Sequence, residues 1–136
     1  MPYIHIQISG PRDDALAGRA AEAAAELTSG ILHKDRALTA AVVEFIEPGH
    51  WFVAGKALAS HGPRSYHWMV SITDETNTKD EKARFIEQAY ARLSALIGEV
   101  HEVSYIHVVD ARAAAYGYGG ATQEHRYQAA RIAAPG

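Results

Sequence analysis

The sequence repeats its own pattern after 64 or 65 residues, and this repeat restricts the fold more than any other feature. Residues 51–55, WFVAG, correspond to residues 116–120, YGYGG, at an offset of 65. The strand and helix patterns correspond at the same offset or at one residue less. Because such self-similarity is typical of a duplicated unit, we expect residues 1–136 to form one domain made of two related units, residues 2–62 and residues 65–130.

The first unit has the pattern of a strand, a helix and a second strand. Residues 3–8 alternate between polar side chains and isoleucine, which is the period of a half-buried strand. Asp13 can cap a helix that we expect to end at Gly30, and residues 38–45 form an apolar run typical of a strand. Because such crossovers are right-handed, the two strands are predicted to be parallel. The apolar positions of the helix are Leu16, Ala20, Ala23 and Leu27.

The second unit follows the same order of elements. Residues 68–72 alternate as a strand does, and Thr78 and Glu81 fit a capping box at the start of a helix. This helix is predicted to end at Gly98, and residues 103–109 are predicted to form the next strand. The positions expected on its apolar face are Ala83, Ile86, Ala89, Tyr90, Leu93 and Ile97.

Composition and charge argue against several classes of function. The chain has 136 residues, of which 48% are hydrophobic, so it can bury one core. It has no cysteine, and it has no apolar stretch near the ~20 residues that cross a bilayer. A net charge of -3 gives no general attraction to phosphate backbones, and the eight histidines lack metal-ligand spacing with a supporting third ligand. We therefore expect a cytoplasmic protein without a metal, membrane or nucleic-acid partner.

The first unit resembles the tautomerase superfamily, typified by 4-oxalocrotonate tautomerase, over nearly its whole length. The resemblance rests on Pro2 after the initiator Met1, on Arg12 after the first strand, and on residues 49–55, GHWFVAG. It implies an α+β fold in which duplicated β-α-β units form a mixed four-stranded sheet, with two helices on one face and a β-hairpin after each unit. The doubled length resembles the fused members of the superfamily, which implies a homotrimer.

The same resemblance makes Pro2 the catalytic residue once Met1 has been removed. A terminal amine titrates near ~7.7 to 8.0, and burial favours its neutral form, so the proline nitrogen can act as a general base. The predicted activity is that of a cofactor-independent tautomerase or isomerase. Its predicted substrate is a small unsaturated 2-oxo or 2-hydroxy carboxylic acid.

The resemblance also gives Arg12 the role of binding a substrate carboxylate. However, seven or eight extended residues at ~3.3 Å each separate Arg12 from Pro2 of the same chain. If a twofold axis relates the two units, Pro2 lies near residues 74–77, and Arg12 lies near residues 65–66, where no proline stands. Arg12 is therefore either a substrate-binding residue or a structural one.

Three further side chains are candidate substrate-binding groups. Tyr105 and His107 share one side of the predicted fourth strand, where they either donate hydrogen bonds to a substrate of a neighbouring chain or pack in the trimer. Tyr116 stands where the superfamily has its hairpin aromatic residue. It either walls the Pro2 pocket and keeps water out, or it belongs to the core of the hairpin.

The sequence departs from the superfamily at its other arginines. Residues 74–77 contain no arginine, although the decarboxylase and the dehalogenase among the fused members of the superfamily carry their carboxylate-binding arginines in this segment. The superfamily has a further carboxylate-binding arginine early in its second strand, and here Ala40 and Tyr105 stand at the two corresponding positions. The cations that could take over this role are Arg64, Arg112 and Arg126. Two alternative functions follow: hydratase, decarboxylase or dehalogenase chemistry on a three-carbon acid with Pro2 as the acid, or a non-catalytic trimeric binding or scaffold protein.

Overall fold

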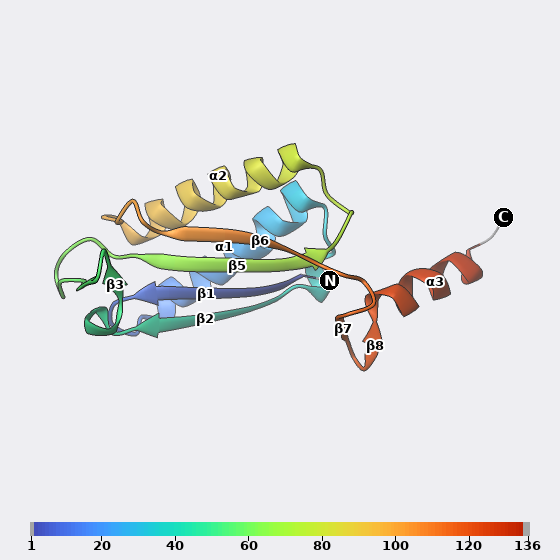
Figure 1. The fold of residues 1–136 in the computed structure, drawn as a ribbon, viewed down its shortest axis with the longest axis horizontal. Helices are drawn as coiled ribbons and strands as arrows, with labels where there is room; N and C mark the ends of the chain where they lie inside the picture. The colour runs from blue at the N-terminus through green and yellow to red at the C-terminus, as the bar shows by residue number, and fades with distance from the viewer. Residues whose placement is uncertain (1, 135–136) are drawn as a thin grey trace.

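The computed structural model describes residues 2–134 and is built on one mixed four-stranded sheet, in the order β2-β1-β5-β6 (Figure 1). Two helices of 19 residues each cover one face of this sheet. The elements are β1 (Tyr3–Ser9), α1 (Asp14–Leu32), β2 (Ala40–Ile46), β5 (Tyr66–Thr73), α2 (Lys79–Ile97) and β6 (Tyr105–Ala111). This arrangement confirms the predicted α+β fold of duplicated β-α-β units.

Each unit is followed by a short hairpin, as the sequence predicted. The remaining elements are η1 (Arg36–Leu38), η2 (Pro48–His50), β3 (Phe52–Val53), β4 (Lys56–Ala57), β7 (Gly117–Tyr118), β8 (Ala121–Thr122) and α3 (Gln123–Ala133). The sequence analysis did not predict α3, which projects beyond the end of the sheet (Figure 1). Thr122 caps α3 by accepting a hydrogen bond from the His125 N–H at 3.0 Å. Within residues 2–134, every helix is too short or too polar to cross a membrane.

The strand register relates the two units to each other. In the centre of the sheet, β1 runs antiparallel to β5, pairing Tyr3 with Ser71 and Ile8 with Tyr66. The outer strands pair in parallel, β2 with β1 and β6 with β5. The start of β1 therefore lies at the same end of the sheet as the end of β5, as the twofold relation predicted.

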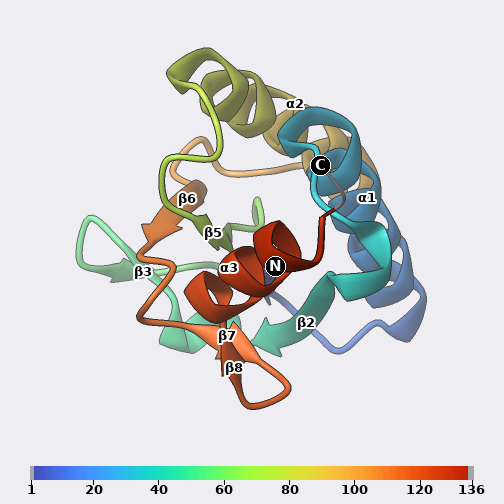
Figure 2. The ribbon, with the colours of Figure 1, turned by 90° about the vertical axis from the view of Figure 1, so that its right-hand side faces the viewer.

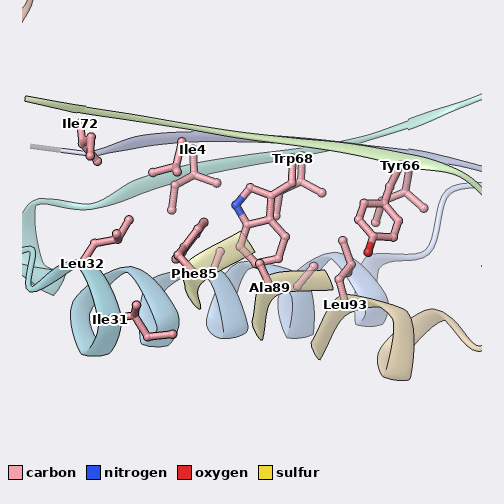
Figure 3. Packing of buried hydrophobic residues seen from close by; sticks show 14 of the residues in the cluster. Ile4, Ile31, Leu32, Tyr66, Trp68, Ile72, Phe85, Ala89 and Leu93 are labelled. Atoms are coloured by element: carbon pink, nitrogen blue, oxygen red, sulfur yellow. The ribbon is translucent and has the colours of Figure 1, made fainter. Parts of the chain in front are cut away.

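The core lies between the sheet and the two helices. Alternation along the strands directs Ile4 from β1 and Trp68 from β5 toward the helices, where both are fully buried (Figure 3). The Phe85 ring of α2 packs edge-to-face on the Trp68 ring, with centroids 5.8 Å apart. The sequence analysis assigned Ile86 and Ala83 to this face instead, which was wrong. The buried face of α2 repeats every four residues from Phe85, so Ile86 is 39% exposed and Phe85 is 0% exposed.

Several predicted boundaries also differ by two residues, among them the following three. Helix α1 continues past Gly30 to Leu32, because its cap is His33 in the left-handed conformation at φ 59°, whose N–H bonds to a helix carbonyl. Strand β2 begins at Ala40 because the η1 turn occupies the preceding residues. Strand β6 begins at Tyr105 because residues 101–104 form hydrogen-bonded turns.

Candidate active site

Pro2 directly precedes β1, one of the two central strands of the sheet, and is buried. Its carbonyl accepts a hydrogen bond from the Ala40 N–H at 3.3 Å, which ties the residue to the beginning of β2. The predicted removal of Met1 concerns a residue outside the described range. In a chain without Met1, burial of the proline nitrogen would favour its neutral form.

The second hairpin is attached to the sheet at the same end. The Tyr116 hydroxyl and Thr73 Oγ1 are hydrogen-bonded at 2.6 Å, and the Asp74 N–H donates to the Ala111 carbonyl at 2.8 Å. Burial raises the pKa of the Tyr116 phenol, so this group stays protonated at neutral pH. The structure therefore places the Tyr116 hydroxyl on Thr73 at the end of β5, while the residue itself lines a small pocket at the second hairpin.

A cleft of about 760 Å³ opens at this end of the molecule. Its walls come from residues 73–76 after β5, from residues 112–114 after β6, and from Tyr118 and side chains of α3. Figures 1 and 2 both place the second hairpin and α3 at the end of the sheet where β1 begins. Chain segments that are far apart in sequence thus surround one cleft at the Pro2 end of the sheet.

Two of the three arginines that could take over the carboxylate-binding role, Arg112 and Arg126, line this cleft. The Arg126 guanidinium lies over the Tyr118 ring, 3.8 Å from its centroid, and its Nη2 donates to the Tyr118 carbonyl at 2.9 Å. Its buried Nε has no hydrogen-bond partner among residues 2–134. A planar guanidinium held in one orientation is suited to binding a carboxylate. Carboxylates of the chain, such as Glu124, also line the cleft, but in this part of the chain none forms an ion pair with either arginine.

The structure does not bring Arg12 to Pro2. Arg12 follows the far end of β1, its side chain is 82% exposed, and its Nε pairs with Asp14 at 2.9 Å. Arg64 also lies at this far end, where its Nε donates to the Ser9 carbonyl at 2.7 Å. The substrate-binding role of Arg12 remains a prediction, and Arg64 is engaged in holding two segments together.

Tyr105 and His107 lie near the start of β6, away from Pro2 of the same chain. The alternating residues Ile106 and Val108 of β6 pack against the core, so Tyr105 and His107 lie on the opposite face of the sheet, away from the two helices. The Tyr105 and His107 rings are stacked, with centroids 5.9 Å apart. Any contact of these side chains with a Pro2 pocket would have to be made in a neighbouring chain, and both expected roles, substrate binding there and packing in the trimer, stay predictions.

The sequence analysis missed the contributions of Thr73 and of α3 to the cleft. The only signal for α3 was Thr122 followed by a stretch of helix-forming residues, QEHRYQAAR. Thr73 carried no signal, because its role depends on the hairpin that the β5–β6 pairing brings beside it.

No protein-family model and no curated protein matches the sequence. Solved structures do match. A fused 4-OT protein, Q0, solved as a wild-type symmetric trimer, is 16% identical and aligns with a TM-score of 0.78 over 90% of this chain and 96% of its own. Pt0534, solved after inactivation by 2-oxo-3-pentynoate, is 14% identical, with a TM-score of 0.80 over 91% of this chain and 98% of its own.

A third structure is N1, a member of the cis-3-chloroacrylic acid dehalogenase family. It is 16% identical and aligns with a TM-score of 0.71 over 96% of this chain and 92% of its own. The chain therefore has the fold of the fused 4-OT and cis-3-chloroacrylic acid dehalogenase proteins over almost its full length. The resemblance to the tautomerase superfamily is confirmed at the level of the fold.

Proposed function

We propose that this protein is a cofactor-independent cytoplasmic isomerase of the tautomerase superfamily, acting on a small unsaturated 2-oxo or 2-hydroxy acid. Pro2 is the general base in the chain from which Met1 has been removed. The observation that carries this proposal is the burial of Pro2 at the end of the sheet that also holds the arginine-lined cleft. The likeness in fold to Pt0534, which 2-oxo-3-pentynoate inactivates, supports a 2-oxo acid as the substrate class.

The proposed reaction moves one proton. The neutral amine of Pro2 removes a proton from the carbon next to the 2-oxo group, and negative charge develops on the substrate oxygen. A hydrogen bond from the protonated Tyr116 hydroxyl can stabilise this charge. The protonated proline then returns the proton to another carbon or to the oxygen, which yields the isomer and regenerates the base.

We further propose that Arg126 and Arg112 bind the substrate carboxylate. They take the place of the arginines that residues 74–77 lack. Arg126 is held by Tyr118, so little side-chain freedom is lost when a carboxylate binds to it. The substrate would then extend from Pro2 into the cleft toward α3.

The proposed active form is a homotrimer that packs through the face of the sheet opposite α1 and α2. This face presents exposed apolar side chains from three strands: Tyr3, Val42, Tyr105 and Val109. Burying such side chains between copies is favourable. The fused 4-OT protein of the same fold was solved as a trimer. Tyr105 and His107 then either reach a neighbouring pocket or pack within this interface.

Removal of the base tests the catalytic proposal. The purified protein is first checked by mass spectrometry for the absence of Met1, and ketonisation of an enolised 2-oxo acid is followed by absorbance. Pro2→Ala is expected to lower kcat/KM by roughly 10²- to 10⁴-fold. Pro11→Ala, an exposed proline beyond the far end of β1, serves as the matched control. Unchanged turnover in Pro2→Ala would contradict the proposal.

The likeness in fold to the N1 dehalogenase-family protein favours one alternative, hydratase, decarboxylase or dehalogenase chemistry on a three-carbon acid. In that case Pro2 is the acid and must be protonated. A pH–rate profile separates the two, because a base loses activity as pH falls through its pKa and an acid loses it as pH rises. A Met1-free protein that is inactive on both substrate classes would instead fit a trimeric binding or scaffold protein.

A further inference from the structure

The face of the sheet opposite the helices carries two different histidine arrangements. The first is an acid-base pair: His5 Nε2 on β1 lies 2.7 Å from Glu44 Oε1 on β2, and Gln7 Nε2 donates to the same oxygen at 2.8 Å. A proton taken up by His5 is therefore compensated by a neighbouring carboxylate.

The second arrangement pairs two imidazoles. His67 Nε2 on β5 lies 2.9 Å from His107 Nδ1 on β6, and the two rings meet edge to face. Tyr105, the register partner of His67, stacks on the other histidine. A hydrogen bond between two imidazoles needs one N–H donor and one free lone pair, so at least one of the rings must be neutral. When both rings are protonated, both nitrogens are donors and the bond is lost.

No carboxylate of residues 2–134 bonds to this pair. The titratable groups that face His67 are His5 from β1, His107 and Tyr105 from β6, and His50, which lines the same shallow cavity. The Glu44 carboxylate on the same face is already bonded by His5 and Gln7. Burial, and after it the charges of His107 and His5, lower the pKa of His67. Protonation of His67 is therefore disfavoured, and no carboxylate bonded to the pair compensates a proton that it takes up.

We propose that the His67–His107 pair makes the contact between copies of this chain through this face sensitive to acid. The inference rests on the proposed trimer, whose interface would cover the pair. In the separate chain His107 is exposed and His67 is half-buried, so water can solvate their charge. Covering them with a second copy removes this water and disfavours the protonated forms.

The direction of the effect follows from proton binding. The assembled form has the lower His67 pKa and binds fewer protons than the separate chains, so assembly weakens as pH falls through the His67 pKa of the separate chain, which lies below the ordinary histidine value of about 6.5. Each proton that assembly excludes lowers the association constant by up to about tenfold per pH unit. With one such proton in each of three chains, the trimer association constant falls by up to about 1000-fold per pH unit.

The test is the assembly state of the Met1-free protein by sedimentation at one fixed concentration, from about pH 8 to about pH 5. Folding is followed in parallel by circular dichroism. The wild type is expected to be trimeric at the upper end and to dissociate while still folded as pH falls. The double variant His67→Gln with His107→Gln keeps hydrogen-bonding side chains but cannot titrate, and it is expected to stay trimeric to lower pH. If the double variant does not fold, His107→Gln alone is used, because this side chain is exposed.

His125→Gln, at an exposed histidine of α3 that lies outside the cavity beside His67, is the matched control and should dissociate as the wild type does. A wild-type trimer that is unaffected by pH, or a variant at His67 and His107 that dissociates with the wild-type profile, would overturn the inference. A monomer at all pH values would overturn it together with the proposed trimer. Turnover measured on the same samples reports separately on Pro2, so failure of the catalytic proposal is distinguishable from failure of this one.

Discussion

Thr73 Oγ1 and the Tyr116 hydroxyl are 2.6 Å apart, although 43 positions separate the two residues in the sequence. This bond joins the end of β5 to the residue before β7. Because Thr73 lines the cleft, the bond fixes the second hairpin against one wall of the candidate active site. The raised pKa of Tyr116 keeps the phenol protonated through the neutral range, so the bond persists there.

A double-mutant cycle checks this connection. Tyr116→Phe and Thr73→Val each remove one hydroxyl, and we expect a coupling energy of roughly 0.5–1.5 kcal/mol between them in urea unfolding. The single variants should also lower kcat/KM, since either one frees the hairpin beside the cleft. Strictly additive losses in stability would show that the two hydroxyls do not act together.

Arg126→Gln should raise KM for a 2-oxo acid by roughly 10- to 100-fold, because a charge-assisted hydrogen bond to the carboxylate is lost. We expect kcat to fall less, since the contact is made in the ground state as well as the transition state. Arg84→Gln, at an exposed arginine of α2, is the matched control. Equal kinetic effects of the two substitutions would argue against a carboxylate site at α3.

Phe85→Ala should lower the free energy of unfolding by about 3–5 kcal/mol, because it leaves a cavity beside the Trp68 ring. Ile86→Ala, at the next and exposed position of the same helix, should cost less than about 1 kcal/mol. Denaturant unfolding measures both. Similar losses at the two positions would contradict the assignment of the buried face of α2.

The capping box of α2 predicts a dependence of stability on acid. Hydrogen bonds, first of all from the Thr78 backbone N–H, lower the pKa of Glu81 in the folded protein. Its stabilising effect is therefore present above the unfolded carboxyl pKa of about 4.3 and is lost as pH falls through the folded value. Glu81→Gln should flatten the loss of stability with acid, whereas Glu87→Gln on the exposed side of α2 should not. Urea unfolding at a series of pH values from neutral to acid checks this, and equal slopes for wild type and Glu81→Gln would refute it.

Much of the fold could be predicted because local patterns of apolar and capping residues indicate its strands and helices. The alternation in residues 3–8 marks the face of β1 that is buried, and the Thr78 capping box marks the start of α2. Helix α3 was missed because its sequence gives no comparably strong local signal. Its sequence is more polar than that of α1 or α2, and none of its described side chains is buried, so too few apolar residues marked it as a helix. Phe85 was missed because Ile86 beside it fits an apolar stripe equally well.

The candidate site was less predictable than the fold. Pro2 could be named from its position in the sequence, but the partners of a site at its end of the sheet come from three distant segments. Their meeting depends on the register of β5 with β6 and on the direction of α3. Nothing local in the sequence indicates that Arg126 lies over Tyr118 or that it lines a cleft, so the sequence left three arginines as equal candidates.

The position of β5 that corresponds to Pro2, at an offset of 64, is occupied by the buried Tyr66. Its hydroxyl lies 3.1 Å from Ser94 Oγ, so this end of the sheet is used for packing against α2. In an assembly of identical single units, every amino-acid substitution at this position would be present at both ends of the sheet. When the two units are joined in one polypeptide, the residues at the two ends can differ. One end can carry the proline that we propose as the base, while the other carries a buried aromatic side chain.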